Sequence, residues 1–127
     1  MKKNKRLLVV DDSKLSRLMI STIVTDQNEN WDILQAASAD EALKYSLEEE
    51  IDAITLDINM PGRTGLEIIP ELKQNLPYAR IAVISANVQK STTQAVIEHG
   101  LRFIPKPISE KKILRFLREA VPVAVAE

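Results

Sequence analysis

Residues 54–65 of the chain read ITLDINMPGRTG. The apolar run that opens this stretch ends at Asp57, and a turn-forming segment with Pro61, Gly62 and Gly65 follows at once. A carboxylate at the carboxyl end of a buried strand is costly unless a partner group stabilises its charge. Asp57 therefore either caps the loop or is held there for chemistry, and the rest of the chain decides between the two.

The composition is that of one folded domain. The chain has 127 residues, of which 45% are hydrophobic and 28% charged, so it can bury a sizeable core. A net charge of −1 gives no general attraction to nucleic acid or anionic membranes. The lack of cysteine excludes disulfides and thiolate metal sites and suits the cytoplasm. The apolar run from Leu7 to Val10 is too short for a signal peptide or membrane helix, so we expect no membrane insertion.

Short apolar runs alternate with helical patterns five times. Strands are expected at residues 6–10, 31–37, 51–56, 79–84 and 101–104. Helices are expected to begin at Ser13, at the S-x-x-E capping box that opens with Ser38, at Gly65, near Lys90 and at Ser109. The residues expected to form the inner face of the first helix are Leu15, Leu18, Met19 and Ile23.

Alternating strands and helices of these lengths predict an α/β fold, a doubly wound parallel sheet of five strands with helices on both faces. We expect residues 1–127 to form a single domain, with residues 122–127 as a tail or the start of a linker. Sheets of this kind bind ligands outside the carboxyl ends of their strands, at the point where the strand order reverses.

Polar residues follow four of the predicted strands. Asp11 and Asp12 follow the first strand, Asp57 the third, Ser85 the fourth and Lys106 the fifth. Each alone is typical of a cap or a turn, but a strand order of 2-1-3-4-5 would place all five on one rim. Three converging carboxylates repel one another, and Lys106 offsets only one charge.

The charge balance of this rim predicts a hard divalent cation. Mg²⁺ prefers oxygen ligands and keeps waters that phosphate oxygens can replace, with Mn²⁺ as an alternative. Carboxylates, a magnesium ion, a lysine and a hydroxyl group are the equipment for phosphoryl transfer. Within such a set an aspartate can itself be the nucleophile.

Four motifs in register carry a resemblance to a known family. They are VDDS at residues 10–13, DINMPG at residues 57–62, Ser85-Ala86 and Lys106-Pro107. From Arg6 to about Val121 the chain resembles the receiver domain of two-component response regulators, of the single-domain, CheY-like kind. The resemblance implies the flavodoxin-like (βα)5 fold with strand order 2-1-3-4-5.

The resemblance also implies a role for each rim residue. Asp57 would accept a phosphoryl group from a histidine kinase, and Lys106 would pair with it. Asp11, Asp12, Asp57 and the backbone carbonyl of Asn59 would bind magnesium. Ser85 and Phe103 would be the switch residues, Asn59 and Asn87 would tune the phosphorylated lifetime, and the Lys106–Pro107 bond would be cis.

The implied partners are a sensor histidine kinase or phosphotransfer protein and a downstream protein target, with no direct binding of nucleic acid. The target would bind the face made by the fourth helix, fifth strand and last helix. We expect the chain to catalyse its own phosphorylation and dephosphorylation rather than to act as a turnover enzyme. In a signalling pathway the domain could act either as a chemotaxis-type output protein or as an intermediate in a phosphorelay.

Two other classes remain as alternatives. A magnesium-dependent aspartyl-phosphate hydrolase is suggested because Asp57-Ile58-Asn59 is similar to the D-x-D nucleophile motif of such enzymes. Steady turnover of a phosphomonoester would favour the hydrolase, and a single stoichiometric phosphorylation would favour the receiver. A nucleotide or flavin binder is disfavoured because Asp11 and Asp12 stand where its phosphate loop would lie, and the chain has only three glycines.

Overall fold

The computed structural model describes residues 4–27, 30–60, 65–86 and 89–120. The strands are β1 (Lys5–Val10), β2 (Trp31–Ala36), β3 (Ala53–Asp57), β4 (Arg80–Ser85) and β5 (Arg102–Pro105). The helices are α1 (Lys14–Gln27), α2 (Ala39–Glu48), α3 (Gly65–Asn75), α4 (Lys90–Glu98) and α5 (Glu110–Ala120). Each predicted element is present, with strand ends within two residues of the expected positions. Among the described helices, none is both long and apolar enough to cross a bilayer.

All strand pairs are parallel, and the order of the sheet is β2-β1-β3-β4-β5, which confirms the predicted fold. The register aligns the carboxyl ends of the central strands, because Val10 pairs with Leu56 and Asp57 pairs with Ile84. Ser85 in turn pairs with Pro105. The polar residues that follow these strands therefore share one rim of the sheet.

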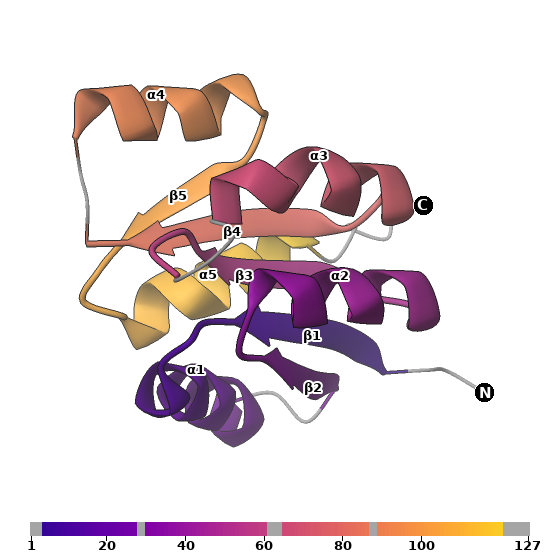
Figure 1. Ribbon diagram of the computed structural model, residues 1–127. Coiled ribbons are helices and arrows are strands. Elements are labelled where there is room, and N and C mark those ends of the chain that lie inside the picture. Colours follow the sequence, from indigo (N-terminus) through magenta and orange to yellow (C-terminus); the bar gives the residue numbers. More distant parts are fainter. Residues whose placement is uncertain (1–3, 28–29, 61–64, 87–88, 121–127) are drawn as a thin grey trace, which may run out of the picture.

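Helices cover both faces of the sheet (Figure 1). Side chains of β1 alternate between two buried clusters, with Leu8 and Val10 in one and Leu7 and Val9 in the other. The first cluster is completed by α2, α3 and α4, and the second by α1 and α5. Buried on both faces, the central strands are nearly continuous apolar runs, which is why the sequence pattern identified them.

The predicted inner face of α1 is wrong for three of its four residues, and only Ile23 packs against the second cluster. Leu15, Leu18 and Met19 are exposed, and the residues of α1 that are buried against the sheet are Ile20 and Val24. Leu15 and Leu18 lie roughly 140° and 160° around the helix axis from Ile20. The inner row of α1 also contains a charged residue, Arg17, which is why the apolar pattern pointed to the wrong side.

Thr55, on β3, has a hydroxyl group that is buried without a hydrogen-bond partner, the one such side-chain atom among the described residues. Burying an unpaired hydroxyl group costs free energy, so Thr55→Val should raise the free energy of unfolding by about 1 kcal/mol. Urea unfolding of metal-free protein measures this change. The matched control is Thr55→Ser, which keeps the hydroxyl group and loses the methyl group. Equal stability of the valine and threonine proteins would show that the hydroxyl group costs nothing.

Candidate functional site

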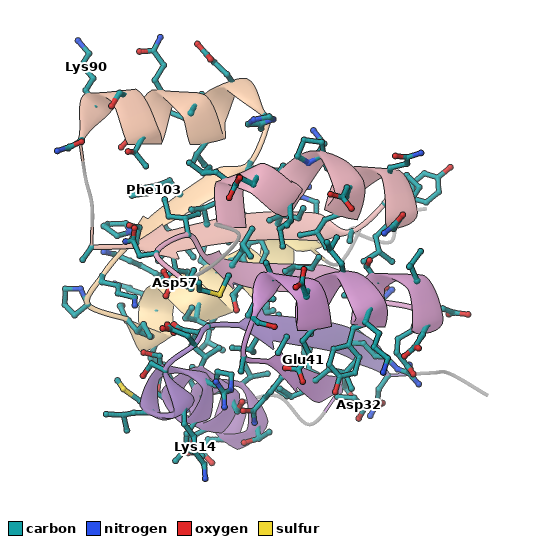
Figure 2. All side chains as sticks on the ribbon, viewed as in Figure 1. Lys14, Asp32, Glu41, Asp57, Lys90 and Phe103 are labelled. Atoms are coloured by element: carbon teal, nitrogen blue, oxygen red, sulfur yellow. The ribbon has the colours of Figure 1, made fainter. Side chains whose placement is uncertain are left out.

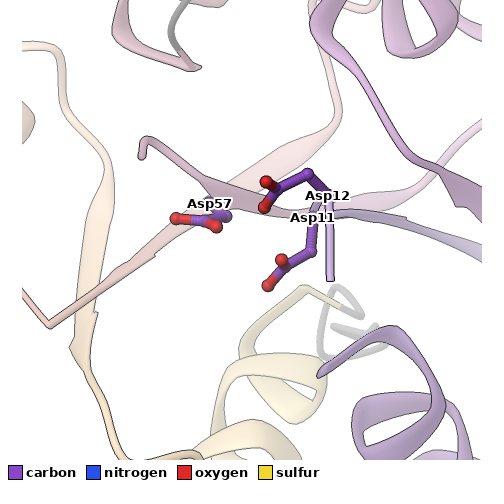
Figure 3. A group of neighbouring side chains, drawn as sticks. All are labelled: Asp11, Asp12 and Asp57. Atoms are coloured by element: carbon purple, nitrogen blue, oxygen red, sulfur yellow. The ribbon is translucent and has the colours of Figure 1, made fainter. Parts of the chain in front are cut away.

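Three carboxylates converge at the carboxyl ends of β1 and β3 (Figure 3). Asp11, Asp12 and Asp57 each place a carboxylate oxygen within 4.8 Å of the others. Asp11 and Asp57 are buried, at 2% and 4% exposure, whereas Asp12 is exposed. The cluster is therefore a set of oxygen ligands with one side open to solvent, which fits a hard divalent cation that keeps some of its water.

The carboxylate of Asp11 is held in place by the backbone just before α1. Its Oδ1 accepts a hydrogen bond of 2.8 Å from the backbone N–H of Ser13. Burial raises the pKa of Asp11 above its ordinary value of 3.8, and the negative charge of Asp57 raises it further. The Ser13 N–H and the ammonium group of Lys106 act in the opposite direction. In metal-free protein, ionisation of Asp11 therefore lowers the free energy of unfolding.

This raised pKa predicts how stability depends on pH in metal-free protein. Asp11 binds its proton more tightly in the native than in the unfolded state, so its contribution to stability is fully present below pH 3.8 and is lost as pH rises through the higher native pKa. Asp11→Asn mimics the protonated form. The variant should match wild type in acid and exceed it at neutral pH, by about 1.4 kcal/mol per unit of pKa difference.

Urea unfolding across this pH range, with a chelator present, measures the effect of Asp11→Asn. The matched control is Asp26→Asn, which removes an exposed carboxylate from α1 and leaves the Asp11 environment intact. A gain in stability for Asp11→Asn that is the same at acidic and neutral pH would contradict a raised pKa of Asp11 in the native state.

Lys106 supplies the positive charge at this rim. Its Nζ lies 3.7 Å from Oδ2 of Asp11 and 3.9 Å from Oδ2 of Asp57. Its backbone N–H donates to the carbonyl of Ser85, which continues the β4–β5 ladder past the last residue of β5. The Lys106–Pro107 bond is cis, the geometry expected for it. The ammonium group thus lies close to two of the three carboxylates. When all three carboxylates are ionised, the net charge of the cluster and Lys106 together remains negative.

Asn59 connects Asp57 to β4. The backbone N–H of Asn59 donates to Oδ1 of Asp57 at 3.0 Å, and its side-chain Nδ2 donates to Oγ of Ser85 at 3.0 Å. Ser85 is fully buried at the end of β4. The structure thus brings the predicted acceptor, lysine and hydroxyl group to one rim. Asn87, which was predicted to tune the phosphorylated lifetime, and residues 61–64 of the predicted turn lie outside the described residues.

Phe103, the second predicted switch residue, lies on β5, and Figure 2 shows it apart from Asp57. It is half-buried and packs against the same cluster that contains Val96, the one buried residue of α4. Phe103 and α4 therefore pack against the same cluster, and β5 itself contacts α4.

Two residues at the site have roles that the sequence pattern missed. Arg17 donates from Nη1 to the backbone carbonyl of Asp11 at 2.7 Å and from Nε to Oε1 of Gln35 at 3.1 Å. A charged residue in the row that contains Ile20 and Val24 is the signal that could have identified it. Gly65 was predicted only as a turn and helix start, but α3 approaches the backbone of β3 so closely there that a Cβ would lie 2.7 Å from the carbonyl oxygen of Asp57.

The family of the chain follows from comparison with known proteins. The family model of the response regulator receiver domain matches residues 7–118. The chain therefore belongs to the receiver domains of two-component signalling systems, and it is of the CheY-like type.

Among the relatives and solved structures, CheY proteins match over nearly their whole length. Chemotaxis protein CheY of Listeria monocytogenes is 34% identical over 116 residues, which cover 91% of this chain and 97% of that protein. CheY of Bacillus subtilis is 32% identical over 117 residues, covering 91% and 97%. The CheY of a CheX–CheY–BeF3–Mg complex from Borrelia burgdorferi superposes with a TM-score of 0.81 at 30% identity, covering 92% of this chain and 89% of that one.

Proposed function

We propose that Asp57 accepts a phosphoryl group from the phosphohistidine of a sensor histidine kinase or phosphotransfer protein, in a reaction that requires Mg²⁺. The observation that supports this most is the convergence of Asp57 with two further carboxylates and Lys106 on one rim. If Asp57 only capped the loop after β3, it would need neither the two carboxylates nor Lys106 beside it. Nucleophile, ligand set and counter-charge together are what transfer to a carboxylate requires.

In the proposed step a carboxylate oxygen of Asp57 attacks phosphorus, the phosphorus–nitrogen bond breaks, and the imidazole leaves. Asp11, Asp12, Asp57 and the backbone carbonyl of Asn59 would hold the metal ion, which when bound offsets charge on the phosphoryl oxygens. Lys106 lies within 4 Å of both buried carboxylates, so its ammonium group can follow the charge from the carboxylate to a phosphoryl oxygen.

The proposed output is a change in protein contacts on the face formed by α4, β5 and α5. Ser85 would bind a phosphoryl oxygen through its hydroxyl group, and Phe103 would change its rotamer with it. The packing of Phe103 in the same cluster as Val96 supports this, because α4 buries only that residue against the core. A helix attached by so little buried surface can shift at small cost, and a downstream protein would bind the shifted form.

We propose a signalling domain that is phosphorylated once per molecule, and not a turnover enzyme. A phosphorelay intermediate would pass the group on, whereas a chemotaxis-type output would use the changed face directly. We also propose a cytoplasmic location, which the lack of cysteine suits.

Labelling with acetyl phosphate tests the function. Wild type with Mg²⁺ should gain one phosphoryl group per molecule by intact mass, and Asp57→Asn should gain none. The matched control is Asp26→Asn, which removes an exposed carboxylate from α1 and should label like wild type. Equal labelling of wild type and Asp57→Asn would refute the proposal, and steady turnover of a phosphomonoester would favour the hydrolase.

A further inference from the structure

The side chain of Asn59 spans the ends of two neighbouring strands. Asn59 lies two residues beyond Asp57 on the β3 side, and Ser85 is the last residue of β4. Because Asp57 pairs with Ile84, the hydrogen bond of 3.0 Å from Asn59 Nδ2 to Ser85 Oγ runs just beyond that pair. The same residue donates its backbone N–H to Oδ1 of Asp57. Asn59 thus contacts both the proposed acceptor and the proposed switch hydroxyl group.

We infer that the amide of Asn59 is a positioning group that holds the Ser85 hydroxyl group in its resting position. This inference rests on the proposed function of the site and goes beyond it by naming one group that restrains Ser85 in the resting state. Ser85 accepts in this bond, because an amide nitrogen can only donate. The proposed shift of Ser85 toward a phosphoryl oxygen on Asp57 moves Oγ away from Asn59 Nδ2, and the bond breaks once that distance exceeds hydrogen-bond range.

The burial of the two residues supports a restraint on the resting state. Ser85 is fully buried, so its hydroxyl group cannot exchange a lost protein partner for bulk water without a rearrangement. Asn59 is exposed, so its amide can turn to solvent when the bond breaks. The bond therefore favours the resting state, and its loss should favour the state in which Ser85 engages the phosphoryl group.

Binding of beryllofluoride, an unreactive phosphoryl mimic, tests the inference at equilibrium and without a hydrolysis step. In the presence of Mg²⁺, Asn59→Ala should bind beryllofluoride roughly three- to tenfold more tightly than wild type, the range that loss of one hydrogen bond in the resting state gives. In a Ser85→Ala background the same substitution should change the affinity less than twofold, since the bond is already absent. Titration followed by ¹⁹F NMR measures both affinities.

The chain offers a matched control. Asn75 Nδ2 donates to Ser46 Oγ at 2.8 Å between α3 and α2, the same type of amide-to-serine bond away from the rim. Asn75→Ala should leave beryllofluoride affinity unchanged. The Mg²⁺ affinity of Asn59→Ala, measured alone, separates any effect on the metal site. Weaker beryllofluoride binding by Asn59→Ala, or an equal effect with and without Ser85, would overturn the inference.

A second measurement needs neither metal nor phosphoryl group. In metal-free protein, Ser85→Ala should shift the side-chain amide resonances of Asn59, and Asn59→Ala should broaden the χ1 distribution of Ser85 seen in NMR couplings. Unchanged Asn59 resonances would overturn the inference. If wild type failed to bind beryllofluoride, the proposed function would fail while the NMR result still decided on the bond; if it bound and the double-mutant cycle were additive, only the restraint by Asn59 would fail.

Discussion

Replacement of Gly65 by alanine should lower the free energy of unfolding by about 2 kcal/mol and slow the labelling of Asp57 by at least about tenfold. A Cβ at this position would lie 2.7 Å from the carbonyl oxygen of Asp57 and 2.9 Å from the Cα of Ile58. Both contacts are with backbone, which no side-chain rotation relieves. Either α3 moves away from β3, which opens the core, or the backbone that carries the acceptor moves.

Helix propensity offsets little of this cost, because alanine is about 1 kcal/mol better than glycine in a helix interior and Gly65 is the first residue of α3. Urea unfolding and the rate of labelling by acetyl phosphate measure the two expected effects of Gly65→Ala. Gly100→Ala is the matched control, since Gly100 has a φ of +76° and nothing within 4 Å of the added Cβ. It should lose roughly 1 kcal/mol from backbone strain and label at the wild-type rate. Normal labelling of a destabilised Gly65→Ala protein would show that the close approach serves packing alone.

Features set by local pattern could be predicted from the sequence. Buried parallel strands are short apolar runs, and each is closed by a polar residue because the chain leaves the sheet there. The S-x-x-E motif predicted the start of α2, and the Ser38 hydroxyl group does accept from the backbone N–H of Glu41. In a capping box the Glu41 carboxylate would accept from the backbone N–H of the cap residue, Ser38. Here it accepts from the backbone N–H of Ala37, one residue earlier.

Features set by contacts between distant residues could not be predicted. The bond from Asn59 to Ser85 joins residues 26 apart and depends on the β3–β4 register. The need for glycine at position 65 depends on how closely α3 approaches β3. The inner face of α1 was misread because the contact of Arg17 with the Asp11 carbonyl places a charge where the pattern expects an apolar residue.

Replacement of Lys106 by methionine should slow the labelling of Asp57 by about 100-fold, the scale for loss of one group that stabilises transition-state charge. The ammonium group is less than 4 Å from Asp11 and Asp57, so methionine keeps the bulk of the side chain and removes the charge. Among the described residues Lys106 is the cation paired with these two carboxylates. Metal-free Lys106→Met should therefore also lose about 1 kcal/mol of stability, the scale for an ion pair with a partly exposed lysine, because the two buried carboxylates are left facing each other.

Lys106→Arg separates charge from geometry. Arginine restores a positive charge, so stability should return toward that of wild type, but its planar fork cannot follow a charge from one oxygen to another as a compact ammonium group does. Labelling of the arginine variant should therefore remain slow. Lys44→Met, at an exposed position on α2, controls for loss of a positive charge elsewhere and should label normally. A Lys106→Met protein that labels at the wild-type rate would remove Lys106 from the reaction and leave it a role in charge balance alone.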